Sequence, residues 1–461
     1  MHNIGRRSVI VGTAGMAAAG ILAKPYIANA QAKSAVVWAT QGFVPAEDEA
    51  FRKTVADYEK KSGNKIELST MPFQAVNQKA ISALTSGDVP DLIFHDAPTT
   101  ILPQNAWNDR LVDVSDVVET QKSKLTESAL LNSSFYNKVT KKRAYYLCPV
   151  KQGATPYHIW GNLVEEAGFK LKDAPDTWDK YWEFFKPVQD SLRKKDRKYR
   201  KIYACGLQIT TVGPNDSNNL MNYFMAANGG GDYITPDGKF HTDDPQIREA
   251  AIRSVEFMSK LYTDGYVPPE ALSWNDADDN NGYHEKLFVM DLDGTLSTEL
   301  AWIKHEQEYL HEMVVTAYPK DNFGKQMIAG VGAGGGFIPK GAKNVAVAKD
   351  FMTYFMRPEV LNENLKGGLG RWLPPMKQIV LDDPYWLDPK DPHRKPYVEL
   401  GVIGPTRPQP FAFNPAYGQF AAEQQWTLCH ANVIKNGMTP AQAVDKCFAR
   451  ANEIFSKVDF G

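Results

Sequence analysis

The residues with the clearest potential for chemistry follow an apolar run in the second half of the chain. Residues 287–290 are apolar, and Asp291, Asp293, Gly294 and Thr295 come soon after them. Two carboxylates this close could act on one substrate, with Asp291 attacking a phosphorus atom and Asp293 serving as general acid and base. A Mg²⁺ ion would neutralise the phosphate charge. The pattern therefore predicts phosphoryl transfer, provided that the surrounding elements can support it.

The same residues resemble the first motif of the haloacid dehalogenase superfamily of phosphatases, and residues 379–383 resemble the acidic motif that holds the metal in those enzymes. The neighbouring elements argue against this interpretation. The first motif lies in mid-chain and not on a first strand, and Pro384 follows the second acidic pair with no strand–helix repeats between the two motifs. A Mg²⁺-dependent phosphatase that uses Asp291 and Asp293 is therefore kept as the alternative function.

Other sequence patterns with known chemistry are absent or misplaced. Gly330, Gly332 and Gly335 have a dinucleotide-binding spacing, but the residues after them predict a strand, so no helix N-terminus is available for a pyrophosphate. Neither Gly-x-Ser-x-Gly nor His-Glu-x-x-His occurs. The four cysteines lack the spacing of zinc ligands, and Cys429 and Cys447, on the last two predicted helices, could form a disulfide bond or stay buried thiols. We therefore expect no catalytic residue, no metal and no cofactor.

Residues 83–98 show how the first part of the chain is built. Gly87 follows a helical repeat of apolar residues, and Pro90 prevents further helix. Residues 92–94 form a short unbroken apolar run, which is typical of a strand buried on both faces. Asp96 comes at the end of this strand, where ligands of open parallel sheets bind.

The preceding segments complete a β-α-β-α-β order. Residues 35–38 and 66–68 are predicted strands, and a helix that starts near Pro45 and ends near Gly63 lies between them. This order predicts a parallel α/β sheet with right-handed crossovers. The first and third strand ends would then lie along one edge of a cleft.

Composition is that of an ordinary globular protein. The full chain has a net charge of −2, and the mature chain has about 430 residues, enough for two domains. Residues 193–201 hold seven basic residues in nine, but a single aromatic residue interrupts them, so a solvated loop is favoured over a nucleic-acid partner. Thr177 is a predicted helix cap, and the aromatic stripe that follows it is predicted to pack in a core: Trp178, Tyr181, Trp182 and Phe185.

The N-terminus predicts export. Met1–Ala32 has the character of a signal segment and is kept out of the fold. Arg6 and Arg7 resemble a twin-arginine (Tat) signal, although the general secretory (Sec) route stays open, and Ala-x-Ala patterns predict cleavage after Ala30 or Ala32. We therefore expect a protein of the periplasm.

Further motifs resemble the extracellular solute-binding proteins that feed ABC importers, in their large sugar-binding group. The matching residues follow the family's order along nearly the whole mature chain: Pro90-Asp91, Ala167-Gly168, Pro175, Thr177-Trp178-Asp179, Tyr266-Val267-Pro268, residues 334–341, Pro358-Glu359, Arg371-Trp372-Leu373-Pro374 and Thr439-Pro440. In this family an apolar strand that ends at a glycine turn against the cleft also matches residues 287–294. The resemblance therefore gives Asp291 and Asp293 a second, non-catalytic interpretation.

The resemblance implies a maltose-binding-protein-like α/β fold of the periplasmic-binding-protein type II. Two lobes would enclose a cleft, with two or three hinge crossings near residues 150–153, 316–330 and 373–376. The N-terminal lobe would comprise residues 33–150 and 330–372, and the C-terminal lobe residues 151–329 and 373–461. Such a protein is a monomeric receptor and not an enzyme: it binds a mono- or oligosaccharide and delivers it to permease subunits in the inner membrane. The sequence leaves the identity of the solute open.

Candidate ligand-binding residues come from strand ends, aromatic side chains and the hinge. Phe43, Trp274 and Trp372 are expected to stack on the apolar faces of a sugar. The expected hydroxyl partners are Gln41, Asp96, Gln152, Asn275 and Asp276, and Gly335 and Arg371 complete the predicted site. Two alternatives stay open: Asp96 could cap the following turn through Thr99, and Arg371 could form a salt bridge at the hinge.

Overall fold

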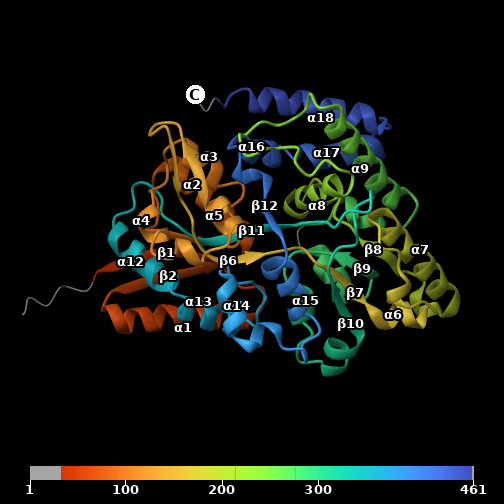
Figure 1. The fold of residues 1–461 in the computed structure, drawn as a ribbon, viewed down its shortest axis with the longest axis horizontal. Helices are drawn as coiled ribbons and strands as arrows, with labels where there is room; N and C mark the ends of the chain where they lie inside the picture. The colour runs from red at the N-terminus through yellow and green to blue at the C-terminus, as the bar shows by residue number, and fades with distance from the viewer. Residues whose placement is uncertain (1–32, 213, 276, 459–461) are drawn as a thin grey trace, which may run out of the picture. The chain divides into compact units, whose positions relative to one another are not determined.

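A computed structural model describes residues 33–212, 214–275 and 277–458 (Figure 1). The predicted export signal and Asp276 lie outside the described residues. Within the described ranges, none of the helices combines the length and apolarity that crossing a membrane requires.

The first part of the chain has the predicted β-α-β-α-β order. Its elements are β1 (Ser34–Thr40), α1 (Pro45–Ser62), β2 (Lys65–Met71), α2 (Phe73–Ser86) and β3 (Leu92–His95). Strand β1 pairs in parallel with both β2 and β3. Pro45 opens α1, and Gly63 and Gly87 end α1 and α2 with φ of 75° and 84°, a left-handed conformation that glycine adopts without strain. The prediction for this segment is confirmed.

The first sheet is completed by strands from later in the chain. Its order is β12-β11-β3-β1-β2, and β6 also pairs with β11. The later strands are β6 (Cys148–Gly153), β11 (Ala329–Phe337) and β12 (Thr406–Pro408). Strand β12, in a segment that the predicted division gives to the second lobe, therefore lies at the edge of the first sheet. Helix α1 packs against α12 (Val345–Phe355) and α13 (Pro358–Gly367), and α2 packs against β1 and β3.

The second sheet has the order β10-β7-β9-β8. Its strands are β7 (Tyr157–Trp160), β8 (Tyr203–Gly206), β9 (Phe288–Leu292) and β10 (Met313–Thr316). Around it lie α6 (Gly161–Glu166), α7 (Trp178–Lys195), α8 (Pro214–Ala227), α9 (Pro245–Thr263), α10 (Asp278–His284) and α11 (Ser297–Leu300). Figure 1 shows the strands of the two sheets in separate parts of the fold.

Shorter elements complete the described chain. They are α3 (Leu102–Trp107), α4 (Ser115–Val118), α5 (Glu127–Ser133), the hairpin β4 (Ser134–Asn137) and β5 (Lys142–Tyr145), α14 (Lys377–Asp382), α15 (Arg394–Val398), α16 (Ala416–Ala422), α17 (Gln425–Ile434) and α18 (Pro440–Phe455). Thr439 caps α18, with a hydrogen bond from Gln442 N to its hydroxyl at 3.2 Å. Cys429 and Cys447 lie side by side as buried thiols on α17 and α18.

The start of α7 departs from the sequence prediction. Thr177 stands at the cap position, but its side chain makes no capping hydrogen bond. Instead Asn322, far along the chain, accepts a hydrogen bond from Asp179 N at 3.0 Å. Asn322, a residue distant in the sequence, therefore supplies the hydrogen-bond acceptor that the Thr177 side chain was expected to provide. The aromatic stripe from Trp178 to Phe185 is buried, as predicted.

The chain crosses between the two sheets at residues 154–156 and 317–328, and the segment after Leu373 contacts both sheets, with α15 against β10 and β12 beside β11. Gln152, just before the first crossing, and Leu373 exchange backbone hydrogen bonds of 2.9 Å each. The predicted two-lobed α/β fold with two or three crossings is confirmed. We call the two parts the first lobe, around the sheet with β1, and the second lobe, around the sheet with β9.

Candidate functional site

A cluster of buried charges lies at the end of β3, and we call Glu47, Asp96, Lys151 and Arg371 the charged cluster. Asp96 forms an ion pair with Lys151 of β6, and both side chains are at least 90% buried. The Lys151 ammonium also lies 5.0 Å from the centre of the Phe94 ring and 4.8 Å from that of Trp372. The fold therefore places the Lys151 ammonium beside the Asp96 carboxylate. The order of the predicted elements gave the position of Asp96 but not its pairing with Lys151.

Arg371 connects the two lobes. Its guanidinium donates to Glu47 of α1 at 3.1 and 3.2 Å and to the hydroxyl of Thr295, in the loop after β9, at 3.2 Å. The Asp96 carboxylate lies 3.9 Å away. Burial would lower the pKa of Arg371, but Glu47 and Asp96 outweigh burial and raise it. Arg371 therefore stays charged between the lobes.

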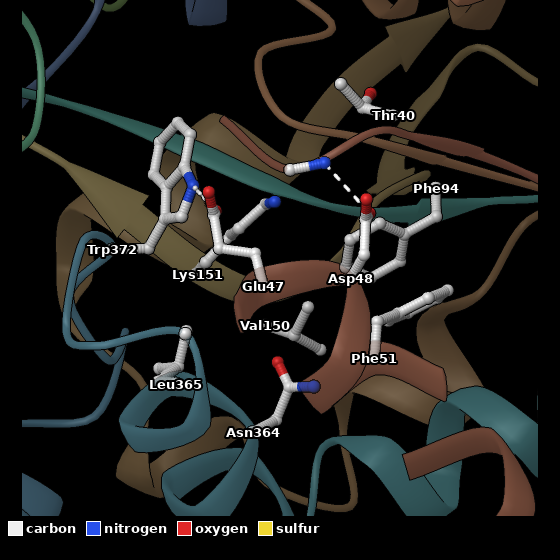
Figure 2. A pocket seen from close by; sticks show the side chains of 12 residues that line it. Thr40, Glu47, Asp48, Phe51, Phe94, Val150, Lys151, Asn364, Leu365 and Trp372 are labelled. Carbon is white, nitrogen blue, oxygen red and sulfur yellow. Dashed lines mark hydrogen bonds between the residues drawn. The ribbon is translucent and has the colours of Figure 1, made fainter. Parts of the chain in front are cut away.

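A pocket opens beside the charged cluster (Figure 2). Figure 2 shows Glu47 accepting a hydrogen bond from the Trp372 indole, which is 3.1 Å long and holds Trp372 against the first turn of α1. Asp48 accepts a hydrogen bond of 2.9 Å from Gly42 N, which fixes the loop after β1 against the same turn. The apolar wall comes from side chains that include Phe51 and Val150.

His95, the last residue of β3, shapes the turn that follows. Burial and the nearby Lys151 lower the pKa of His95 to about 3, so its ring is neutral. Its Nδ1 accepts a hydrogen bond of 3.1 Å from Ala97 N. The His95 imidazole therefore accepts a backbone hydrogen bond in the turn that Asp96 would cap in the alternative interpretation.

A larger pocket, which we call the amide cavity, lies between elements of both lobes. One wall is formed by α2 and the loop after β3, and the other by the start of α8 and by residues 409–422. Its lining residues are Phe73, Gln74, Asn77, Ile81, Ala97, Thr99, Thr100, Asn218, Asn219, Gln409, Pro410, Phe411, Tyr417, Ala421 and Ala422. None of these described lining residues carries a charge. The cavity therefore combines amide and hydroxyl groups with aromatic rings.

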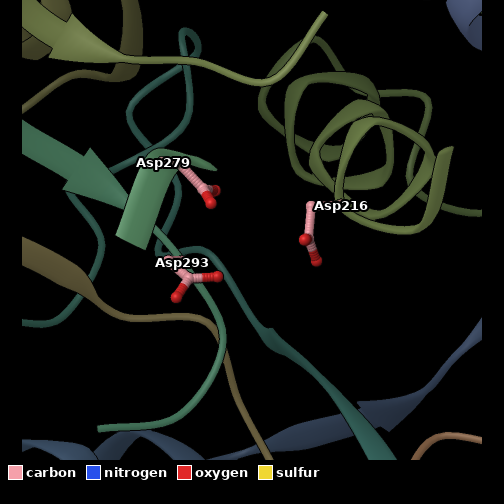
Figure 3. A group of neighbouring side chains, drawn as sticks. All are labelled: Asp216, Asp279 and Asp293. Atoms are coloured by element: carbon pink, nitrogen blue, oxygen red, sulfur yellow. The ribbon is translucent and has the colours of Figure 1, made fainter. Parts of the chain in front are cut away.

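Three aspartates gather on the second lobe (Figure 3), and we call Asp216, Asp279 and Asp293 the aspartate triad. Their carboxylate oxygens all lie within 4.8 Å of one another. Asp291, two residues before Asp293, is almost fully buried, and burial together with Asp279 and Asp293 raises its pKa well above the usual value. The same part of the lobe thus holds several carboxyl groups close together.

The structure places the predicted ligand-binding residues in several environments. Asp96, Arg371 and Trp372 meet in and beside the charged cluster. Phe43 is 39% exposed, and the centre of its ring lies 5.2 Å from the Arg371 guanidinium carbon and 6.5 Å from the centre of the His284 ring in the second lobe. Gln41 is exposed on the same loop.

The remaining predicted residues lie apart from these groups. Gln152 is buried, with its amide donating to Gly401 O at 2.9 Å and accepting from Thr126 at 3.1 Å. Trp274 is 6% exposed and packs on Phe288 at 6.0 Å. Asn275 is exposed, and its side-chain oxygen accepts a hydrogen bond of 3.0 Å from Ala277 N, two residues further along the chain. Gly335 lies in β11 where a Cβ atom would come within 2.0 Å of Cys148 O, so close packing of two strands accounts for it.

Comparison with known proteins assigns the chain to a family. The sequence profile of the bacterial extracellular solute-binding proteins matches residues 53–395, well over half of the chain. This chain is a bacterial extracellular solute-binding protein. The predicted family is thereby confirmed. Membership also supports the prediction that the protein acts outside the cytoplasm.

Relatives of this solute-binding protein agree with the assignment. An arabinooligosaccharide-binding protein of Bacillus subtilis (strain 168) is 22% identical over 341 residues, which cover 70% of this chain and 71% of the relative. A solute-binding protein of Thermotoga lettingae bound with α-D-tagatose has a TM-score of 0.73 at 20% identity, covering 92% of this chain and all of that one. Maltose-bound MalE3 of T. maritima has a TM-score of 0.71 at 16% identity, covering 91% and 100%. The solved structures support the two-lobed fold.

The phosphatase interpretation of Asp291 and Asp293 gains no support from these comparisons. Asp291 is only 2% exposed, and β9 lies between antiparallel β7 and parallel β8. The Asp291 side chain thus has almost no contact with solvent, which does not favour attack on a phosphate from solution. The motif forms the end of an interior strand of the second sheet.

Sequence reasoning missed the residues of the amide cavity and half of the charged cluster. The predicted site contains Gln152 but not its neighbour Lys151, and alternation along β6 places the two on opposite faces. Glu47 lies in the first turn of α1, where a carboxylate is common for local reasons. Gln409 and Tyr417 lie between the motifs at residues 371–374 and 439–440, so no local signal points to them.

Proposed function

We propose that this solute-binding protein is the receptor of an ABC importer and binds a neutral mono- or oligosaccharide between its lobes. The solute occupies the amide cavity and reaches toward the charged cluster. The protein then delivers it to the permease subunits in the membrane. It acts as a monomer and catalyses no reaction.

The lining of the amide cavity is the observation that carries the proposal. A sugar offers hydroxyl groups around its edge and apolar C–H groups on its faces, so its site needs amide partners and flat rings. Gln74, Asn77 and Gln409 provide amides, and Phe73 and Phe411 provide rings. Because no lining side chain is charged, a neutral polyhydroxylated solute fits better than an ionic one. An oligosaccharide-binding relative and saccharide-bound neighbours support the same class.

The residues around the charged cluster complete the proposed site. Phe43 and Trp372 are the stacking residues, and the Asp96 carboxylate accepts hydroxyl hydrogen bonds from the solute while it holds Lys151. Closure of the lobes would strengthen these bonds because it removes water. Arg371, already bonded to Glu47 and Thr295, links the lobes as they close.

Binding is tested by thermal-shift screening of the purified mature protein against a saccharide library, followed by calorimetric titration of the hits. Asn77→Ala should weaken the affinity for the best saccharide about 10-fold, the effect of one lost hydrogen bond. Gln78→Ala, at the exposed neighbouring position on α2, should leave the affinity unchanged and serves as the matched control. Equal affinities of the two variants would contradict the placement of the solute.

Two further measurements test the rest of the proposal. Incubation with Mg²⁺ and p-nitrophenyl phosphate should give no turnover, and hydrolysis that Asp291→Asn abolishes would restore the phosphatase hypothesis. N-terminal sequencing of the protein exported by its host should find Gln31 or Lys33 first. Retention of Met1 would contradict the proposed export.

A further inference from the structure

We propose that Cys429 and Cys447 form a disulfide bond that links the last two helices, α17 and α18, in the exported protein. The spacing of the cysteines in the sequence leaves open whether they form a bond or stay thiols, so the geometry of the helix pair has to decide. The bond depends on the proposed export, because disulfide bonds persist in oxidising compartments outside the cytoplasm.

Helices α17 and α18 form a helical hairpin near the C-terminus (Figure 1). They pack against each other, and a short loop, residues 435–439, connects them. The centres of the Trp426 ring on α17 and the Phe448 ring on α18 lie 6.2 Å apart. Cys429 and Cys447 each lie within about two helical turns of the loop, so they stand at similar levels of the hairpin.

The thiol of Cys429 is directed at α18. It donates a hydrogen bond of 3.5 Å to Ala443 O on α18, and one of 3.4 Å to Gln425 O on its own helix. Ala443 lies one helical turn before Cys447, and a helical side chain leans toward the N-terminus of its helix, so the Cys447 side chain lies over the same turn. Burial, and then a hydrogen bond with Cys429, raise the pKa of Cys447 well above its usual value. The two sulfur atoms are therefore neighbours.

The surroundings of the pair do not fit a zinc site. Cys429 is 1% exposed and Cys447 is 2% exposed. Zinc in a structural site is held by four ligands. Within the part of the chain that the structure describes, the aspartate triad is the one group of three or more side chains placed to share a metal ion. The cysteine pair is thus suited to a disulfide bond and not to zinc.

Oxidation of the pair needs an external disulfide, of which glutathione disulfide is an example. The thiolate of one cysteine attacks the external disulfide and releases one thiol. The other cysteine then attacks the mixed disulfide and releases the second thiol. The two cysteines lose two protons and two electrons and gain one S–S bond, and the external disulfide is reduced to two thiols.

Burial determines when this reaction can take place. The thiolate is the reactive form, and the raised pKa of Cys447 keeps its thiol protonated in the folded protein. The bond therefore forms while the chain folds, or when the C-terminal helix α18 opens locally. After folding, the same burial shields the bond from reductants in solution.

The bond is tested on the purified mature protein, unfolded with dithiothreitol and refolded in a mixture of reduced and oxidised glutathione. The refolded protein is alkylated with N-ethylmaleimide in guanidinium chloride, and its mass is measured. We expect maleimide groups on Cys148 and Cys205 alone, which are buried in strands of different sheets, and a pair of proteolytic peptides joined through Cys429 and Cys447. Maleimide on all four cysteines, or a bond that involves Cys148 or Cys205, would overturn the proposal.

Matched variants separate this bond from other effects of oxidation. The wild type refolded with glutathione should melt about 3 °C above the wild type refolded with dithiothreitol, because a disulfide bond restricts the unfolded chain. Cys447→Ala should melt at one temperature after both treatments. Cys148→Ala is the control and should keep the difference of the wild type. A difference that persists in Cys447→Ala would contradict the assignment to this pair, and the mass measurement needs no variant if Cys447→Ala does not fold.

None of these measurements uses a saccharide, so four alkylated cysteines would leave the proposed carbohydrate binding untouched. Conversely, a protein that forms the bond but binds no saccharide would refute the proposed function alone. Export is tested separately, by N-terminal sequencing of the protein that the host exports.

Discussion

Replacing Asp96 with asparagine should destabilise the unliganded protein by about 3 kcal/mol. The substitution keeps the shape of the side chain but leaves the Lys151 ammonium, with a side chain only 10% exposed, without its counter-charge. Removing one partner of a buried ion pair costs about 3–5 kcal/mol. The rings of Phe94 and Trp372, about 5 Å from the ammonium, retain part of its stabilisation, so the lower end of that range is expected.

The assay is urea unfolding followed by tryptophan fluorescence, with the m-value as a check that the unfolded states are comparable. Lys151→Met removes the cation, and the double variant should be less destabilised than the sum of the two single variants, because the two side chains act as a pair. A loss below about 1 kcal/mol for Asp96→Asn, at an unchanged m-value, would refute the reasoning, since this is the range of a solvated surface pair.

Two other predictions follow from close packing and from charge. Gly335→Ala should destabilise the protein by about 3 kcal/mol or more, because the new Cβ atom would lie 2.0 Å from Cys148 O. Gly332→Ala on the same strand is the control and should cost far less, because the nearest atom to its Cβ would be 3.9 Å away. Urea unfolding compares the free energies of the two variants. Arg450 lowers the pKa of Glu423 to about 2, so the stability from this pair is complete above about pH 4.5 and is lost as the pH falls toward 2. Over that pH range, the melting temperature of Glu423→Gln should fall less than that of the wild type. Equal falls in melting temperature would contradict the role of the pair.

The first lobe was predictable because its information is local. The apolar run 92–94, Pro90 and the glycine that ends α2 each act within a few residues, and the β-α-β order then dictates parallel pairing. The same holds for the aromatic stripe of α7. Its cap was not predictable, because the acceptor that replaces Thr177 is Asn322, 143 residues away from the donor Asp179.

The site was only partly predictable, because it depends on long-range contacts. Position at a strand end sufficed for Asp96, but the sequence does not show that Lys151 would neutralise it. Gln152 is polar and near the hinge, which made it a reasonable ligand candidate, yet its amide bonds to Gly401, 249 residues further along the chain. Trp274 illustrates the common outcome for tryptophan, which packs in a core more often than it faces a ligand.

Hydrogen–deuterium exchange on the saccharide-bound protein tests the central claim most directly, since it reports where the solute lies. With the best saccharide from the titrations, amide protection should increase at once in segments of both lobes, around residues 73–81 and 97–100 and around 218–219 and 409–422. Protection confined to one lobe, or lying away from these four segments, would contradict a solute held between the lobes in the amide cavity.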